Sequence, residues 1–164
     1  MIPSKHPSEK IIPLEAIAPI CADLKSNHYS IATLNGSFDL VHAGHIYMIE
    51  EAAKQADVLI LALNSDESIQ QYKSADRPII PLKKRLALLS AFEMIDYLTW
   101  FDETTPEQFL KKAQPTVHVN GQEYGTNCLE APLLRQLGTR LHLVPRLPGL
   151  STSDLIRKIQ HLSN

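Results

Sequence analysis

The chain has little cysteine, and its two cysteines are isolated. Cys21 and Cys128 belong to no CxxC pair and to no ladder of cysteines and histidines. A disulfide framework or a structural zinc site is therefore not expected. Free, scattered cysteines fit a reducing compartment, and the predicted location is the cytoplasm.

Long apolar runs and blocks of positive charge are missing as well. The apolar segment IIPLEAIAPICA near the N-terminus is interrupted by Glu15 and two prolines, so neither a signal peptide nor a membrane span is expected. The formal net charge is −2, and no block of lysine and arginine forms the basic stripe that neutralises a nucleic-acid backbone. Neither a membrane nor a nucleic acid is an expected partner.

Three familiar glycine motifs are also absent, in a chain with only six glycines. Without GxxxxGK[ST] and GxGxxG, the sequence has neither a P-loop nor the dinucleotide-binding fingerprint. Without GxSxG, it has no nucleophile elbow. A phosphate pocket in this protein has to be built in another way.

What the sequence does contain is a regular alternation of short apolar runs with helical patterns. The 164 residues, 44% of them hydrophobic, suit one core. Strands are predicted over 30–36, 58–63, 97–101, 116–119 and 141–144, and helices over 14–26, 43–54, 82–92, 106–113, 129–137 and 151–161. This order predicts a single α/β domain with a Rossmann-like, doubly wound parallel sheet over 31–164, preceded by an extension over 1–30 that carries a short helix. Such sheets bind ligands at the carboxyl ends of their strands.

The stretch NGSFDLVHAGH, residues 35–45, stands where the first strand meets a helix. Gly36 and Gly44 have no side chain to collide with a ligand, so an Asn-Gly turn here lets the backbone approach one closely. The start of the helix offers unpaired N–H groups that favour an anion. His42 and His45, three residues apart, add two more donors. The stretch therefore predicts a phosphate pocket.

Two other interpretations of the histidines stay open at this point. A histidine pair is often surface or core decoration without chemistry. Alternatively, His42, His45 and Asp39 have the chemistry of a transition-metal site, although no further cluster of ligands supports one.

The stretch NGSFDLVHAGHIYMIEEA resembles the signature of the HxGH nucleotidyltransferases, the cytidylyltransferase-like superfamily. Within it, the chain most resembles the adenylyltransferase domain that makes ADP-heptose from D-glycero-D-manno-heptose 1-phosphate. Four more segments resemble that family in the same order: LALNSDES, YKSADRPIIPLKKRLALLSAFE, FDETTPEQFL and LPGLSTSDLIRKI. The similarity spans roughly residues 31–160.

This resemblance implies transfer of AMP from ATP, with Mg²⁺, to a sugar 1-phosphate for lipopolysaccharide core or a related surface glycan. A sugar phosphate oxygen attacks the α-phosphorus, and pyrophosphate leaves. Because a phosphate monoester is already largely dianionic near neutral pH, no general base is required. The resemblance also implies a homo-oligomer, with a dimer as the commonest form.

By resemblance, His42 and His45 contact the triphosphate and stabilise the transition state, and the amides of Ser37 and Phe38 cradle phosphate. Asp39 either orients the loop, helps to hold Mg²⁺ or caps the helix. The other residues expected to bind nucleotide or phosphate are Asn35, Gly36, Gly44, Asn64, Asp66, Lys73, Arg77, Asn120, Gly121, Ser151, Thr152 and Ser153.

Several of these residues keep a plainer interpretation. Lys73 and Arg77 form either a mobile cationic flap over the phosphates or solvated loop charges. Arg85, a third expected catalytic residue, has an ordinary surface arginine as its alternative. The hydroxyls over 151–153 bind the leaving pyrophosphate or cap the last helix.

The segment NSD has two interpretations of the same kind. Asn64 and Asp66 follow the central strand and are placed to meet a ligand, but this segment also makes an ordinary strand-to-helix turn.

One departure from the family bears on the substrate. Where the family commonly has VKGGDY, this sequence has VNGQEY, so Asn120 stands at a lysine position and Gln122 at a glycine position. The kinase domain often fused to this adenylyltransferase is not in the sequence, so a separate heptose kinase is expected. Two alternatives remain: a cytidylyltransferase acting on glycerol 3-phosphate or a similar phosphoalcohol, and a nucleotide-binding protein without turnover.

Overall fold

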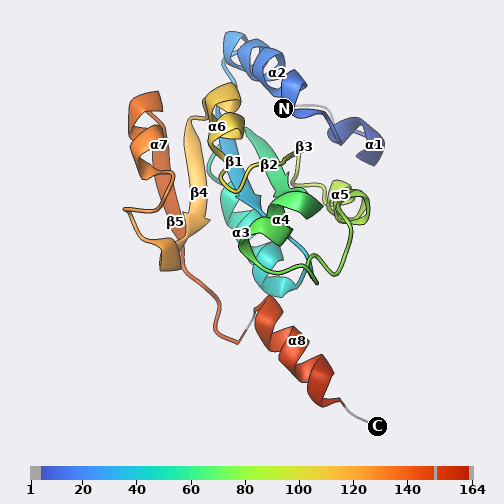
Figure 1. The fold of residues 1–164 in the computed structure, drawn as a ribbon. Helices are drawn as coiled ribbons and strands as arrows, with labels where there is room; N and C mark the ends of the chain where they lie inside the picture. The colour runs from blue at the N-terminus through green and yellow to red at the C-terminus, as the bar shows by residue number, and fades with distance from the viewer. Residues whose placement is uncertain (1–4, 150, 163–164) are drawn as a thin grey trace.

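A computed structural model describes residues 5–149 and 151–162 of the protein (Figure 1). Its elements in chain order are α1 (Pro7–Lys10), α2 (Leu14–Ser26), β1 (Ile31–Gly36), α3 (Ala43–Ala53), β2 (Val58–Asn64), α4 (Asp66–Tyr72), α5 (Leu82–Ser90), β3 (Tyr97–Phe101), α6 (Glu107–Ala113), β4 (Val117–Gly121), the 3-10 turn η1 (Gln122–Tyr124), α7 (Ala131–Leu137), β5 (Arg140–Val144) and α8 (Thr152–His161). Each strand expected from the sequence is present. The helix boundaries differ from the predicted ones by a few residues at most.

The five strands form one parallel sheet in the order β3-β2-β1-β4-β5. The chain builds outward from β1 to β3 and then returns to add β4 and β5 on the other side, so the order reverses between β1 and β4. This confirms the predicted doubly wound α/β fold. The carboxyl ends of β1 and β4 flank the crevice that such a reversal creates, which is the usual ligand site of the architecture.

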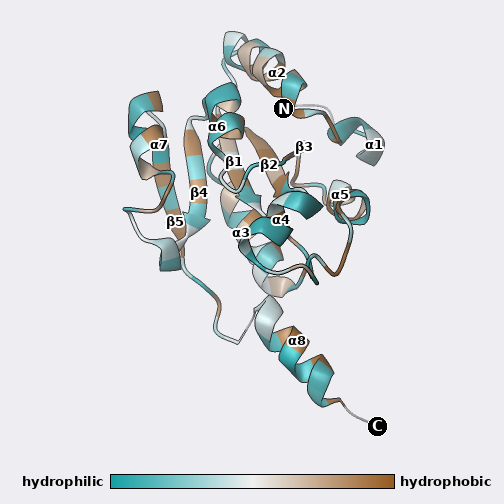
Figure 2. Cartoon of the chain, in the orientation of Figure 1, coloured by the Kyte–Doolittle hydropathy of each residue, from teal (hydrophilic) through white to brown (hydrophobic). Residues whose placement is uncertain are grey.

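Helices cover both faces of the sheet and enclose two apolar clusters. On one face, α3 and α5 contribute Ile49 and Leu89, which pack on β1 and β2. On the other face, α2, α6 and α7 pack with side chains such as Phe109 and Leu134. All seven residues of β2 are buried, as expected for a central parallel strand, and Figure 2 shows this strand as apolar.

Residues before β1 pack on the body of the domain. Ile17 and Cys21 of α2 are buried in the cluster that contains Phe109. Ahead of α2, the backbone N–H of Ile12 donates to the carbonyl of Leu98 at 2.8 Å, so this segment covers the exposed side of the edge strand β3.

Three short elements were not predicted: α1, α4 and η1. Helix α4 begins at a cap in which the Ser65 hydroxyl accepts from the Ser68 amide at 3.1 Å. Among its seven residues, only Ser68 and Ile69 are buried. Two buried neighbours define no helical period, so the pattern on which the sequence-based prediction depends cannot appear in an element this short.

No helix in the part of the chain that the structure describes combines the length and the apolar character needed to cross a bilayer.

Strand β4 contains a buried histidine beside β1. His118 is fully buried, and its Nδ1 is 2.8 Å from the Thr33 hydroxyl. Its Nε2 has no hydrogen-bond partner among the described residues. Burial lowers the pKa of His118 from the ordinary 6.5 to about 4, because the interior disfavours the charged ring.

This histidine is expected to make stability depend on pH. In the unfolded chain His118 takes up a proton near pH 6.5, whereas in the folded protein it does so only near pH 4. The stability contributed by the neutral ring is therefore complete above pH 6.5 and is lost as the pH falls toward 4. Between pH 7 and pH 5 the free energy of unfolding should fall by about 2 kcal/mol from this group. Urea unfolding at the two pH values measures the difference.

The matched variants are His118→Gln and His142→Gln, the second on the neighbouring strand β5. We expect H118Q to be less stable at pH 7 but to lose about 2 kcal/mol less between pH 7 and pH 5 than the unaltered protein. H142Q should keep the full dependence. The same pH dependence in H118Q and in the unaltered protein would contradict this account.

Candidate active site

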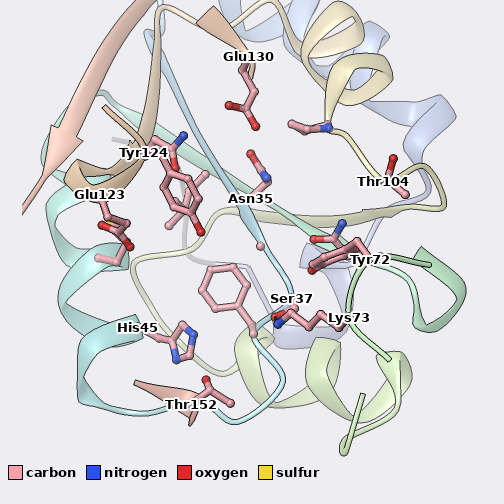
Figure 3. Close-up of a pocket in the computed structure, with 17 residues that line it drawn as sticks. Asn35, Ser37, His45, Tyr72, Lys73, Thr104, Glu123, Tyr124, Glu130 and Thr152 are labelled. Carbon is pink, nitrogen blue, oxygen red and sulfur yellow. Dashed lines mark hydrogen bonds between the residues drawn. The ribbon is translucent and has the colours of Figure 1, made fainter. Parts of the chain in front are cut away.

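Two adjoining hollows open at the carboxyl ends of β1 and β4. The first has a volume of about 390 Å³ and the second about 290 Å³. Figure 3 shows the residues around the first hollow. Both hollows are bordered by His45, Met48, Glu123, Tyr124 and Thr152. The site therefore lies where the strand order predicts it.

The loop between β1 and α3 differs in detail from the expected Asn-Gly turn. Asn35 and Gly36 are still part of β1, and the left-handed residue is Phe38, with φ of 47°. A side chain on Gly36 would come within 3.1 Å of the Phe38 ring. The missing side chain at Gly36 thus makes room for a buried aromatic ring, besides leaving the strand end open to the first hollow.

The two histidines form a reciprocal cap at the start of α3. The amide of Gly44 donates to His42 Nδ1 at 3.1 Å, and the amide of His42 donates to His45 Nδ1 at 3.3 Å. An amide N–H can only donate, so both Nδ1 atoms must be unprotonated acceptors. A neutral ring of this kind carries its proton on Nε2, and this N–H remains available to a ligand.

Their pKa values agree with neutral rings. Burial, followed by the nearby His42 and Lys73, lowers the pKa of His45 to about 4. Burial and the positive charge of Arg146 lower the pKa of His42. His45 borders both hollows and His42 borders the second. The pair therefore offers hydrogen-bond donors near neutral pH and adds no positive charge.

Asp39 holds the segment that precedes α5. Its carboxylate accepts from the amides of Ile79 and Ile80 at 2.9 and 2.8 Å and from Arg77 Nε at 2.7 Å. Burial by itself would raise the pKa of Asp39, but these bonds and the Arg77 charge outweigh it, and the pKa is lowered. Of the roles considered for Asp39, the geometry fits orientation of the loop.

The metal and capping roles do not fit Asp39. The cap of α3 is His42, and the Asp39 carboxylate is only 1% exposed with both oxygens already bonded. Among residues 5–149 and 151–162, no three His, Cys, Asp or Glu side chains gather as a metal site would require. Neither the hypothesis of a Mg²⁺ ligand at Asp39 nor that of a transition-metal site with His42 and His45 fits this geometry.

Lys73 and Arg77, the two cations expected to form a flap, have different partners in the structure. Arg77 pairs with Asp39, with 2.6 Å between its Nη2 and the carboxylate, and it borders neither hollow. Lys73 borders the first hollow, with its Nζ 3.1 Å from the Ser37 hydroxyl. Lys73 is thus placed to meet phosphate, whereas Arg77 fixes the loop.

Arg85 is neither a surface arginine nor exposed to the hollows. The side chain is fully buried, and its Nη1 donates to the carbonyls of Ser37 at 2.6 Å and Asn64 at 2.9 Å. Its Nε donates to the carbonyl of Ile80 and its Nη2 to Asp66, at 2.9 and 2.7 Å. The structure therefore corrects the expected catalytic contact to a positioning role, since one guanidinium ties together three segments that surround the site.

In the NSD segment, Asn64 fits the interpretation as a ligand contact and Asp66 fits that of a strand-to-helix turn. Asn64 borders the first hollow, while its amide nitrogen donates to the Ser68 hydroxyl at 2.9 Å. Asp66 accepts from the amide of Leu82 at 2.9 Å and from Arg85, and it borders neither hollow. Asp66 is a structural residue in this fold.

The start of α8 both caps the helix and closes the site. The Ser151 hydroxyl accepts from the Asp154 amide at 3.1 Å and donates to its carboxylate at 2.6 Å, so this residue is the cap. Thr152 borders both hollows, and Ser151 and Ser153 border the second.

Asn120 and Gly121, the last two residues of β4, differ in whether they border a hollow. Asn120 borders the first hollow, and its Oδ1 accepts from the Gly121 amide at 2.9 Å. Gly121 itself borders neither hollow. A side chain on it would come within 2.4 Å of the Glu123 carboxylate, so glycine allows Glu123 to fold back over β4.

Sequence reasoning missed several residues that border the hollows. Those with polar side chains are Tyr72, Thr104, Glu123, Tyr124 and Glu130 at the first hollow and Tyr47 and Arg146 at the second. Arg146 immediately precedes the LPGL run, and Glu123 and Tyr124 belong to the VNGQEY segment that departs from the family pattern. Both places therefore gave a local signal in the sequence. Tyr72 and Thr104 lie within two further segments that resemble the family, YKSADRPIIPLKKRLALLSAFE and FDETTPEQFL, so they gave a signal as well, whereas Glu130 gave none.

The model of the family described as cytidylyltransferase-like matches residues 33–158. The chain belongs to this family. It is a nucleotidyltransferase, and its HxGH histidines are the pair that caps α3.

Relatives of this nucleotidyltransferase include proteins named bifunctional protein HldE. The one from Streptomyces coelicolor is 36% identical over 140 residues, which cover 85% of this chain and 30% of the relative. The one from Geotalea uraniireducens is 35% identical over 158 residues, covering 94% of this chain and 32% of the relative. The chain therefore spans about a third of the length of these relatives.

Two crystal structures share the fold of this nucleotidyltransferase. A lipopolysaccharide core biosynthesis protein from Thermoplasma volcanium superposes with a TM-score of 0.59 at 24% identity, covering 73% of this chain and 97% of that one. A pantoate-beta-alanine ligase from Francisella tularensis superposes with a TM-score of 0.63 at 15% identity, covering 93% and 79%. At these identities the likeness concerns the fold.

Proposed function

We propose that this nucleotidyltransferase transfers AMP from ATP to a sugar 1-phosphate, D-glycero-β-D-manno-heptose 1-phosphate, and gives ADP-heptose and pyrophosphate for lipopolysaccharide core or a related surface glycan. The reciprocal histidine cap beside Lys73, at the crevice between β1 and β4, carries this proposal. The five segments that resemble the ADP-heptose-forming domain, and the similarity to proteins named HldE, support the choice of substrates.

The reaction needs little more than positioning and donors. An oxygen of the sugar phosphate forms a bond to the α-phosphorus of ATP, and the bond from that phosphorus to the bridging oxygen breaks, so that pyrophosphate leaves with its electrons. The attacking oxygen is already ionised, so no proton has to be removed. Catalysis then depends on bringing two anions together and on stabilising the charge that develops on oxygen.

Each residue has a part in this scheme. The Nε2–H groups of His42 and His45 donate to the triphosphate, and Lys73 supplies a positive charge beside Ser37. The amides at the start of α8, near Thr152, receive the departing pyrophosphate. Mg²⁺ enters with ATP, because this ion is commonly held by substrate phosphates and water.

The test is pyrophosphate release in the presence of Mg²⁺, with ATP or CTP combined with heptose 1-phosphate or glycerol 3-phosphate. Release of pyrophosphate only with the combination of ATP and heptose 1-phosphate supports the proposal. Release with CTP and glycerol 3-phosphate would replace it with a cytidylyltransferase. If no combination releases pyrophosphate while ATP still raises the melting temperature, the protein binds nucleotide without this turnover, and the proposal is wrong.

A further inference from the structure

The first hollow has two chemically different ends. Ser37, His45, Lys73 and Thr152 lie together at one end, where they offer donors and a positive charge. Glu130 lies at the other end, and Figure 3 shows its carboxylate pointing toward Asn35 across the hollow. Phosphate groups belong at the first end, so the Glu130 end is left for a part of a substrate that carries no phosphate.

The carboxylate of Glu130 is not neutralised by a neighbouring cation. Within the described ranges, no lysine, arginine or histidine forms an ion pair with Glu130 or with Glu123. Together with burial, the two carboxylates raise the pKa of Tyr124. Burial and Glu130 likewise raise the pKa of the Cys128 thiol. Glu130 thus brings an unpaired negative charge to the wall of a site that has to receive anions.

The lack of a cation here follows from the sequence. Asn120 borders the same hollow, lies like Glu130 beside the Cys128 thiol, and stands where the family commonly has lysine. The Asn120 side chain accepts from the amide of Gly121, and it has no charge to offer Glu130. The Glu130 carboxylate therefore has oxygen acceptors left for a ligand, and as an ionised group it can only accept.

The choice among ligand groups follows from the pattern of donors. A pair of neighbouring hydroxyls presents two donors to the two oxygens of a carboxylate. An adenine edge presents its N6 donor beside ring-nitrogen acceptors, and this alternation suits an asparagine or glutamine amide better than a carboxylate. A phosphate would be repelled. With ATP as the nucleotide of the proposed function, hydroxyl groups are the partner that fits.

We propose that Glu130 is a specificity-determining residue that accepts hydrogen bonds from neighbouring hydroxyl groups of a bound substrate. The hydroxyls belong either to the ribose of the nucleotide or to the sugar of the acceptor, which share this chemistry. The inference rests on the proposed function, because it uses the same hollow and names how its second end selects a substrate.

The experiment is a double-mutant cycle in which a substrate hydroxyl and the Glu130 carboxylate are removed singly and together. Steady-state kinetics compare ATP with 2′-deoxyATP and 3′-deoxyATP, and heptose 1-phosphate with a deoxy analogue, for the unaltered protein and for Glu130→Gln. The exposed Glu15→Gln on α2 is the control for a generic loss of charge. Melting temperatures establish that both variants are folded.

We expect kcat/KM of the unaltered protein to fall by about tenfold or more when the recognised hydroxyl is missing, as for a lost charge-assisted hydrogen bond. E130Q should show a similar loss with the complete substrate, mainly in KM, and little further loss with the deoxy substrate. This non-additivity is the signature of a direct contact. E15Q should behave as the unaltered protein.

The arms of the experiment separate the two sources of hydroxyl. Non-additivity in the nucleotide arm assigns Glu130 to the ribose, and non-additivity in the acceptor arm assigns it to the sugar. Additive losses in both arms, or no loss in E130Q, would overturn the inference. If the unaltered protein has no turnover, the proposed function fails instead, and the same comparisons are made from the rise in melting temperature on adding each substrate.

Discussion

His45→Ala is expected to lower kcat/KM for pyrophosphate release by about 100-fold, with most of the loss in kcat. His45 is half-buried at the junction of the two hollows, and burial keeps its ring neutral by lowering its pKa to about 4. Its Nε2–H is then a donor that the reciprocal cap holds in a fixed orientation. Removing one such donor from a preorganised site typically costs a factor of about 100 to 1,000.

The variant also removes half of the helix cap, and this effect has to be separated. His45 Nδ1 accepts from the His42 amide at 3.3 Å, and losing such a cap costs about 1 kcal/mol of stability. In His45→Asn, the shorter side chain can still accept from that amide but does not extend as far into the hollow. We expect H45N to be nearly as stable as the unaltered protein and nearly as inactive as H45A.

His142→Ala, on strand β5, serves as the control for loss of a histidine outside the two hollows. It should retain full turnover. If H45A turns over at the unaltered rate while remaining folded, the histidine pair has no part in catalysis, and the scheme proposed for this site fails.

Arg85→Met is expected to lower the free energy of unfolding by about 3 to 5 kcal/mol, because each buried acceptor that is left without a donor costs about 1 to 3 kcal/mol. Arg85 is fully buried, and the three carbonyls that its guanidinium satisfies would lose their donor. Asp66 would lose its ion-pair partner as well. Urea unfolding and the melting temperature measure the loss.

Arg85→Lys tests whether geometry or charge decides this loss. A lysine keeps the positive charge, but its single nitrogen cannot reach acceptors that are spread around Nε, Nη1 and Nη2. We therefore expect R85K to be destabilised nearly as much as R85M. Lys84→Ala, exposed on the same helix, should change stability by less than about 0.5 kcal/mol. Stability in R85M equal to that of the unaltered protein would contradict the positioning role.

The Arg85 variants also have a kinetic consequence. Arg85 Nη1 donates to the carbonyl of Ser37, in the loop that leads from β1 to the histidine cap. Loss of this bond should reduce turnover in the fraction that remains folded. The activity loss should then accompany the stability loss, which distinguishes Arg85 from a residue such as His45, for which we propose direct contact with the substrate.

The sequence alone determined the fold and the place of the site. The run over residues 58–63, apolar along its whole length, is typical of a parallel strand covered on both faces, and helical spacing before and after it sets the alternation that makes the sheet parallel. The HxGH segment was found for a similar reason. His42 and His45 are close in sequence, and a cap joins residues within one turn, so its partners can be read from the local order.

Only the tertiary structure decided the roles of the charged side chains. Asp39 and Arg77 are 38 residues apart, and Arg85 is 48 residues from Ser37, yet each pair forms a hydrogen bond in the folded chain. Glu130 enters the first hollow from a loop after β4 without any local pattern. A charge in a loop is compatible with solvent, with a structural partner and with a ligand. Which of the three it meets depends on how distant segments pack, because burial and neighbouring charges set its partners and its pKa.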